Sequence, residues 1–250
     1  MAVFPSGHEM LDILYADDHL VAINKPAGLL VHRSPIDRRE TRFALQLLRD
    51  QLGRPVYPAH RLDKPTSGVL LFALSPEVAR ALGESFAHGA VEKTYLAVLR
   101  GVCPETGIID YPLLEEPDRL AVYPAQSDKP AQEAVTSFRR LAQVELPFAV
   151  GRYPSSRYSL VEARPHTGRR HQLRRHFKHL FHPIIGDTKY GEGRHNRFFR
   201  EHFGCHRLLL AATRLAFPHP LDGRQLVIEA PLDPAMAALL GQLGWSDCLP

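Results

Sequence analysis

HRLDKPTSG (60–68) runs directly into VLLFAL (69–74), and this stretch decides the fold. VLLFAL is a continuous apolar run between turn formers, which predicts a β-strand buried on both faces. The nine residues before it bring a carboxylate, a guanidinium, an imidazole and hydroxyl groups to the edge of that strand. Pro65 and Gly68 restrict the chain path, so we expect the Asp63 carboxylate to be held in a fixed orientation, as a catalytic group must be. A tight turn with an ion pair uses the same residue types, and that interpretation stays open.

The rest of the chain predicts an α+β fold. Apolar residues at helical spacing, with Ser75 and Asp233 as N-caps, indicate helices at 42–52, from Pro76 to just before Gly89, at 169–181 and at 234–243. Apolar runs between turn formers indicate a hairpin in 11–26 and further strands at 91–101, 107–113, 119–124, 133–141 and 157–165. The segments 126–130 and 146–156 are expected to be loops. Because the strands are grouped and do not alternate with helices, an α+β domain is favoured over a βαβ fold.

Length and composition indicate one folded unit. The 250 residues can bury a sizeable core, and we expect a single domain over 1–250. No apolar run approaches the roughly 18 residues of a membrane helix, and the N-terminus lacks the order of a signal peptide. A cytoplasmic protein without a membrane partner is therefore expected. Three cysteines, far apart and without a CxxC pair, argue against a disulfide framework or a thiolate zinc site.

Positive charge is concentrated in one segment. Residues 164–200 hold ten Lys or Arg against two carboxylates, a net charge of +8, although the whole chain carries only +4. Such a segment suits a polyanion with regularly spaced phosphates, because each neutralised phosphate releases counterions. A solvated helix face has the same composition, and that alternative stays open. Five residues of this segment are expected to contact RNA: Arg169, Arg170, His171, Arg175 and Lys178.

RPHTGRRHQLRRH (164–176) places two arginines four residues apart within this segment. On the helix predicted there, Arg170 and Arg174 share a side. One guanidinium could approach a phosphate while the other pairs with a buried carboxylate and holds it ionised, and Asp63 is the expected partner. The four histidines between 171 and 182 lack HExxH spacing and a nearby acidic ligand, so no metal site is expected.

Tyr95 lies in the predicted strand EKTYLAVLRG (92–101), where a core position is the usual fate of a tyrosine. Opposite Asp63 its ring would instead stack on a base, a contact worth about 1 to 3 kcal/mol. That is enough to hold an extruded nucleotide against the cost of unstacking it. The chain has no GxxxxGK motif, and GEGRHN (191–196) lacks the third glycine of a dinucleotide fingerprint, so no nucleotide cofactor is expected.

Four segments, in their order and spacing, resemble the RluA-type pseudouridine synthases: HRLDKPTSGVLLFA (60–73), EKTYLAV (92–98), PHTGRRHQLRRH (165–176) and HPIIGDTKYG (182–191). NKPAGLLVH (24–32) is similar to the first motif of that family, so the resemblance covers most of the chain. It implies the pseudouridine synthase fold, a mixed and largely antiparallel sheet with flanking helices, crossed by a basic central cleft. Residues 1–20 leave no room for the N-terminal RNA-binding domain that some relatives carry.

The resemblance also implies roles for individual residues. Asp63 matches the family's catalytic aspartate, Arg61 the arginine that helps to extrude the uridine, and Tyr95 the tyrosine under the base. Arg174 matches the arginine paired with the aspartate. Three further residues match motif positions: His60, Leu173 and Lys93. Of these, His60 and Leu173 are expected to contact the substrate. Ala211 departs from the pattern, because similar sequences usually carry a histidine there, which puts an accessory contact in doubt.

The function that the resemblance implies is conversion of uridine in folded RNA to pseudouridine, without a cofactor. PAQEAV (130–135), ELPFAVGRYPSSRYSLVE (145–162) and NRFFREHFG (196–204) are most similar to members that modify uridine 65 of certain tRNAs. The expected partner is therefore tRNA, with rRNA as the alternative, and the default oligomeric state is a monomer. A non-catalytic RNA-binding protein stays open, as does a glycoside or nucleoside hydrolase, which ordinarily needs two carboxylates.

Overall fold

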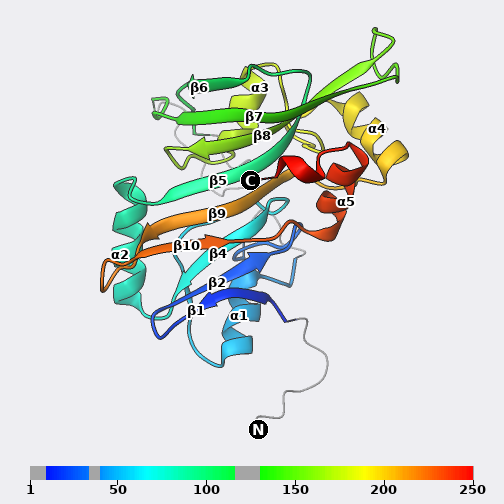
Figure 1. Ribbon diagram of the computed structural model, residues 1–250. Helices are drawn as coiled ribbons and strands as arrows, with labels where there is room; N and C mark the ends of the chain where they lie inside the picture. The colour runs from blue at the N-terminus through cyan, green and yellow to red at the C-terminus, as the bar shows by residue number, and fades with distance from the viewer. Residues whose placement is uncertain (1–9, 34–39, 116–129, 250) are drawn as a thin grey trace.

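The computed structural model describes residues 10–33, 40–115 and 130–249. Its strands form one sheet with the order β1-β2-β4-β9-β5-β8-β7-β6, in which β3 also pairs with β4 and β10 with β9 (Figure 1). The strands are β1 Asp12–Ala16, β2 Leu20–Lys25, β3 Tyr57–Pro58, β4 Ser67–Ala73, β5 Glu92–Arg100, β6 Thr106–Asp110, β7 Val135–Leu146, β8 Ser156–Pro165, β9 Leu210–Pro218 and β10 Gln225–Glu229. β4 and β9 are parallel and the other pairs are antiparallel. The predicted α+β class with a mixed, largely antiparallel sheet is confirmed.

The sequence did not predict the strands β9, which is central in the sheet, and β10, which pairs with β9. The run LLLAATRLAF (208–217) is largely apolar, and periodicity alone does not separate a buried strand from a buried helix in such a run. The predicted loop at 146–156 connects β7 to β8, which end and begin at its two limits. The predicted strand at 119–124, and most of the predicted loop at 126–130, lie outside the residues that the structure describes.

Three of the five described helices begin after a residue whose side chain caps them. The helices are α1 Ala44–Leu52, α2 Pro76–Ala87, α3 Gln172–His179, α4 Gly193–Phe203 and α5 Pro234–Gln242, followed by a 3-10 turn at Ser246–Cys248. The Ser75 hydroxyl accepts a hydrogen bond from the Val78 amide in α2, and the Asp233 carboxylate accepts one from the Met236 amide in α5. α4, which the sequence did not predict, is capped by the Glu192 carboxylate.

The predicted helix at 169–181 is shorter than expected. It begins at Gln172 because His171 has a left-handed backbone with φ of 55°, which no residue inside an α-helix adopts. Arg170 therefore precedes the helix, and the expectation that Arg170 and Arg174 share a helical side is wrong. The consequence is that Arg170 and His171 take up positions before α3 that helical spacing does not describe.

The two faces of the sheet are covered by different helices. Successive residues of β5 point to opposite faces, so that Leu96 and Val98 pack with α4 and α5 while Ala97 and Leu99 pack with α3. α1 lies on the α3 side and packs with a neighbouring cluster, and Tyr95 contacts both clusters on that side. Tyr95 therefore sits where the two halves of the core meet.

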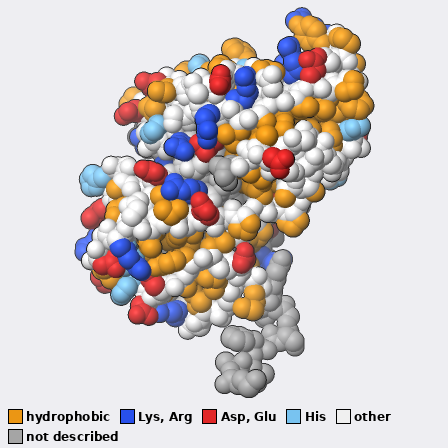
Figure 2. Space-filling model, viewed as in Figure 1, with side chains coloured by type: hydrophobic (Ala, Val, Ile, Leu, Met, Phe, Trp, Pro, Cys, Tyr) orange, Lys and Arg blue, Asp and Glu red, His pale blue; other side chains and the backbone are white. Residues whose placement is uncertain are grey.

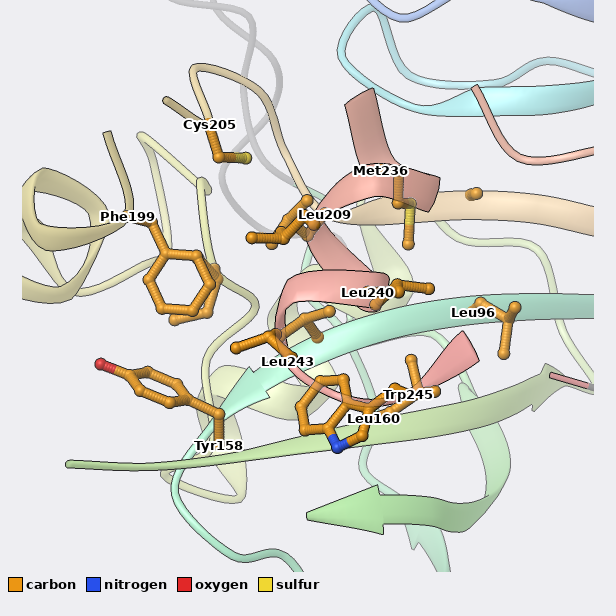
Figure 3. Packing of buried hydrophobic residues seen from close by; sticks show 14 residues of the cluster. Leu96, Tyr158, Leu160, Phe199, Cys205, Leu209, Met236, Leu240, Leu243 and Trp245 are labelled. Carbon is orange, nitrogen blue, oxygen red and sulfur yellow. The ribbon is translucent and has the colours of Figure 1, made fainter. Parts of the chain in front are cut away.

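The α4–α5 face holds an apolar core. Figure 3 shows its side chains converging on the sheet: Leu96, Tyr158, Leu160, Phe199, Cys205, Leu209, Met236, Leu240, Leu243 and Trp245. On the outer surface of this face, acidic and basic side chains are interspersed and no single sign dominates (Figure 2). Within the described ranges, none of the helices is both long enough and apolar enough to cross a bilayer.

Gly68 permits the close parallel approach of β4 and β9. It pairs with Ala212, has φ of 111°, and a Cβ atom at this position would collide with the Ala212 carbonyl oxygen. Nearby, the Arg207 guanidinium donates a hydrogen bond to the Ser67 hydroxyl at 2.9 Å. This junction joins the two halves of the sheet directly behind the loop that carries Asp63.

Gly68→Ala is expected to destabilise the fold by about 3 kcal/mol, because it combines a disfavoured backbone conformation with a backbone collision. Urea unfolding followed by circular dichroism measures the loss. Gly53→Ala is the matched control, since Gly53 also has positive φ but has open space around its Cβ position, and about 1 kcal/mol is expected there. Equal losses in the two variants would contradict the importance of the β4–β9 approach.

Candidate active site

The loop that carries Asp63 is tied down at several points. The Thr66 amide donates to the Asp63 carbonyl oxygen at 3.0 Å, and the Gly28 amide donates to the Lys64 carbonyl oxygen at 2.8 Å. Lys25 is fully buried, and its ammonium donates to the carbonyl oxygens of Pro26, Leu29 and Lys64. Burial lowers the pKa of Lys25 to about 7, assisted by the charge of Arg207 and opposed by that of Asp63. The loop is thus fastened to the segment after β2.

His60 fastens the same loop to β4. Its Nε2 atom accepts a hydrogen bond from the Leu71 amide at 3.1 Å, and its ring stacks on Phe86 with 5.0 Å between centroids. Burial lowers the pKa of His60 to about 4, so that the imidazole is neutral at pH 7. The structure therefore shows a positioning contact for His60, which also borders the cleft next to Asp63.

Arg174 joins α3 to two carboxylates. Its Nη1 atom lies 3.2 Å from Asp63 Oδ2, while Nε and Nη2 donate to Asp187 Oδ2 and Oδ1 at 2.7 and 2.9 Å. The Arg174 and Asp187 side chains are only 7% and 1% exposed, whereas Asp63 is 18% exposed. Asp187 thus orients the guanidinium from behind, and the remaining nitrogen faces the carboxylate that is open to solvent.

The ionisation of this pair follows from its contacts. Burial alone raises the pKa of Asp187, but the hydrogen bonds and charge of Arg174 and two backbone amides outweigh it, so the net shift is downward. For Arg174, burial lowers the pKa, and Asp187 followed by Asp63 more than reverses this, so the net shift is upward. Both groups remain charged at neutral pH. Asp187 was not among the residues predicted from the sequence, although it lies in the HPIIGDTKYG segment (182–191).

His171 lies on the other side of the Asp63 carboxylate. Its Nε2 atom is 3.8 Å from Asp63 Oδ1, and its Nδ1 atom is 2.9 Å from the Tyr190 hydroxyl. Burial lowers the pKa of His171 to about 4; Asp63 opposes this shift, while the cations Arg174, Arg170 and Lys189 add to it. The ring is 14% exposed and neutral, so it adds no positive charge to the RNA-contact set in which the sequence analysis placed it.

Asp63 opens into a cleft of about 590 Å³, a volume typical of small-molecule sites. The residues around this cleft include all five predicted substrate contacts: His60, Arg61, Tyr95, Leu173 and Arg174. Arg169, Arg170 and Lys93 also border it, so the cleft is basic. Asp63 is the one acidic residue among the described residues that line it.

Tyr95 provides a flat apolar surface next to Asp63. Burial, followed by the negative charge of Asp63, raises the pKa of Tyr95, so it is a neutral phenol at physiological pH. Leu173 is 5% exposed and extends this surface from α3. The Lys93 ammonium donates to the Thr167 carbonyl oxygen at 3.2 Å, and burial lowers its pKa. A planar base could rest on Tyr95 with its sugar directed at the carboxylate.

Apart from His171, which also borders the cleft, the predicted RNA contacts divide into two groups. Arg169 and Arg170 are exposed at the rim of the cleft, and the Arg169 guanidinium donates to the Glu133 carbonyl oxygen. Arg175 and Lys178 lie further along α3; Lys178 is exposed, and the Arg175 guanidinium donates to the Leu114 carbonyl oxygen at 2.9 Å. Only the first group borders the Asp63 cleft.

Two further positions are placed outside the cleft. Ala211 is buried in the α4–α5 cluster, on the opposite face of the sheet, so its methyl group does not face Asp63. His176 is buried, with Nδ1 at 2.9 Å from the Thr136 hydroxyl and Nε2 at 3.1 Å from the Tyr111 carbonyl oxygen.

In the described part of the chain, no three His, Cys, Asp or Glu side chains are grouped as metal ligands.

Comparison with known proteins identifies related sequences and folds. Residues 19–179 match the family described as RNA pseudouridylate synthase. The chain is 55% identical over 240 residues to tRNA pseudouridine synthase C of Vibrio cholerae, covering 96% of this chain and 98% of the other. It is 56% identical over 235 residues to the protein of that name from Haemophilus ducreyi, covering 94% and 96%. The solved structure of human RNA Pseudouridylate Synthase Domain Containing 4 superposes with a TM-score of 0.71 at 28% identity, covering 93% of each chain.

Asp187→Asn is expected to destabilise the protein by about 3 kcal/mol at pH 7, because it leaves the buried Arg174 without its bidentate partner. The pKa of Asp187 is lowered in the folded state, so its contribution is present above the ordinary aspartate pKa of about 3.9 and is lost as the pH falls through the folded value. The difference between wild type and variant should therefore shrink below about pH 4.

Urea unfolding at pH 7 and pH 3.5 tests this expectation. Because the pKa values of His60 and His171 are lowered in the folded state, the free energy of unfolding of both proteins also falls between about pH 6.5 and 4. This fall is the same in wild type and variant, so it cancels in the difference between them. Asp50→Asn is the control, since its ion pair with Arg49 is exposed and should be worth less than about 1 kcal/mol. A difference between Asp187→Asn and wild type that does not change with pH would contradict the assigned ion pair.

Proposed function

Because the chain belongs to the RNA pseudouridylate synthase family and is thus an isomerase that converts uridine in RNA to pseudouridine, we propose that Asp63 is its catalytic carboxylate and tRNA its substrate. The observation that carries the catalytic assignment is the contact between Asp63 and Arg174, at the floor of a basic cleft that Tyr95 borders. Relatives over 50% identical across nearly the whole chain bear the name tRNA pseudouridine synthase C, which supports tRNA. Uridine 65 is the position that we propose, from the resemblance of 130–135, 145–162 and 196–204.

The reaction requires a single well-placed carboxylate. The N1 to C1′ bond of uridine breaks, the uracil turns, C5 joins C1′, and the proton on C5 is replaced by one on N1, so that atoms balance without an oxidant or reductant. Asp63 either attacks C1′ to form a sugar ester or removes the 2′ proton to form a glycal. Both routes need an ionised carboxylate, and the Arg174 guanidinium at 3.2 Å favours that form.

The other residues of the cleft hold the nucleotide. We assign Tyr95 to stack under the extruded uracil, with Leu173 completing the apolar surface, and Arg61 to help extrude the uridine. Arg61 is exposed at the rim, where it can reach the RNA helix. Arg169 and Arg170 contact the phosphates that flank the uridine, and Arg175 and Lys178 contact RNA further along α3.

Several expectations from the sequence belong to the same proposal. The enzyme acts without a cofactor, since the isomerisation involves no net redox change and no group donor. It acts as a monomeric single domain in the cytoplasm, where tRNA is processed. The described strands all join one sheet, which supports one catalytic unit.

Two alternatives outside the family make different demands on the cleft. A glycoside or nucleoside hydrolase ordinarily uses two carboxylates on either side of the bond, and the described lining of this cleft includes one. A purely RNA-binding protein gains nothing from an acidic group among its cations, because that group repels phosphates. Within the family, rRNA is the second candidate substrate, since the catalytic residues report the chemistry and not the RNA that docks.

Asp63→Asn is expected to reduce turnover by at least about 1,000-fold while tRNA affinity changes little, because the amide keeps the shape but loses the charge. Tritium release from 5-tritiated uridine measures turnover on tRNA and rRNA separately, and filter binding measures affinity. Mapping of the modified base in tRNA then tests position 65. An active Asp63→Asn enzyme would remove Asp63 from the mechanism, and release from rRNA alone would replace tRNA as the substrate.

Arg170→Gln is expected to raise KM for tRNA about 3- to 10-fold, with little change in kcat, and to reduce the slope of log affinity against log salt by about 0.9. Arg224→Gln is the control, since Arg224 follows β9 and its guanidinium contacts Asp17 and Asp222. An unchanged salt slope for Arg170→Gln would show that Arg170 does not contact a phosphate.

A further inference from the structure

His171 connects Tyr190 to the free side of the Asp63 carboxylate. Arg174 occupies Asp63 Oδ2, and the His171 Nε2 atom lies 3.8 Å from Oδ1, with the Tyr190 hydroxyl 2.9 Å from Nδ1. The carboxylate therefore has a guanidinium on one oxygen and an imidazole on the other. The 3.8 Å separation is longer than a hydrogen bond, so the contact in this structure is electrostatic.

The backbone of His171 is held in a conformation that histidine adopts at a cost. Its φ of 55° and ψ of 27° are left-handed, and only one other described residue besides glycine, Phe181, has positive φ. Such residues persist where the surrounding structure imposes them, and they concentrate at functional sites. Here the left-handed conformation directs the imidazole toward Asp63 just before α3 begins. The first turn of α3 then places Arg174 next to the same carboxylate.

The tautomer of His171 follows from its two neighbours. If Nδ1 carried the proton, Nε2 would present a lone pair to the carboxylate oxygen, and the two would repel each other. If the Tyr190 hydroxyl donates to Nδ1, the proton sits on Nε2 and points at Asp63 Oδ1, which is attractive. Tyr190 is itself held by its ring, which lies under the Arg174 guanidinium at 5.1 Å and near the ammonium of Lys189.

A second contact matters because the last torsion of an aspartate is soft. Rotation about the bond that carries the carboxylate is broad and roughly two-fold, so one contact at Oδ2 leaves the plane of the group poorly defined. An N–H group that faces Oδ1 favours one orientation of that plane by electrostatic attraction, while the remaining lone pairs stay available to the sugar. Catalytic rates depend steeply on such orientation.

We propose that His171 is a positioning residue, which, together with Tyr190, fixes the plane of the Asp63 carboxylate for its reaction with the ribose. This inference rests on the proposed function and replaces the phosphate contact that the basic sequence around His171 suggested. The groups that face the imidazole are Asp63 and Tyr190, with the cations Arg170, Arg174 and Lys189 around them. Those cations, and not the neutral ring of His171, supply the positive charge of this part of the cleft.

His171→Gly provides the test, since glycine adopts the left-handed backbone without strain and leaves an imidazole-sized space between Tyr190 and Asp63. The single-turnover rate at saturating tRNA is expected to fall 10- to 100-fold, with tRNA affinity unchanged within about two-fold. Imidazole added to the reaction is expected to restore the rate at least several-fold. His206→Gly is the control, since His206 is exposed in a loop, and imidazole should not change its rate.

Three outcomes would overturn the inference: an unchanged rate, a loss of affinity with an unchanged saturating rate, or a folded His171→Gly protein that imidazole does not rescue. Should His171→Gly fail to fold, Tyr190→Phe decides, because it keeps the ring and removes only the hydroxyl. A 3- to 10-fold fall in the saturating rate supports the proposal, and an unchanged rate refutes it. If Asp63→Asn is inactive while His171→Gly is fully active, this inference fails and the proposed function stands; if Asp63→Asn is active, the proposed function itself fails.

Discussion

The position of one buried guanidinium organises this protein's cleft. Arg174 is held from behind by both oxygens of Asp187 and presents its remaining nitrogen to Asp63. The two carboxylates differ because one is enclosed and fully satisfied while the other opens to solvent. A charge pair with excellent geometry can be tolerated in a protein interior, and here it gives a rigid support from which a second, accessible carboxylate is oriented.

The sheet brings the partners of this contact together from distant parts of the chain. Asp63 precedes β4, Tyr95 lies in β5, and Arg174 lies in α3, and the β4–β9–β5 order brings the three to one face. Gly68 allows β4 and β9 to approach closely enough for this arrangement. Hydrogen bonds of Lys25 and His60 then hold the Asp63 loop against β2 and β4. The position of the carboxylate therefore depends on these contacts and not on the loop alone.

Burial sorts the ionisable groups of the cleft into charged and neutral ones. His60 and His171 are kept neutral and serve as hydrogen-bonding or dipolar contacts, and Tyr95 is kept as a phenol. Arg174 remains charged because its carboxylate partners offset the cost of burial. The result is a basic cleft with one acidic residue, Asp63, in its described lining, which is the arrangement that the proposed reaction on the sugar of a polyanion requires.

The sequence by itself determined the elements whose signals are local: the buried strand after HRLDKPTSG, the capped helices α2 and α5, the hairpin in 11–26, and the concentration of cations before and within α3. Its charges left either Arg170 or Arg174 as the partner of Asp63, and the resemblance to the RluA-type synthases implied Arg174. Tertiary structure decided what local patterns do not contain. Asp187 behind Arg174, the left-handed His171 that shortens α3, the central place of β9 and the burial of Ala211 on the far face depend on contacts between residues far apart in the chain. Helical and strand periodicity describe only near neighbours, whereas these features arise where separate segments must satisfy one another's charges, hydrogen bonds and volume in the folded core.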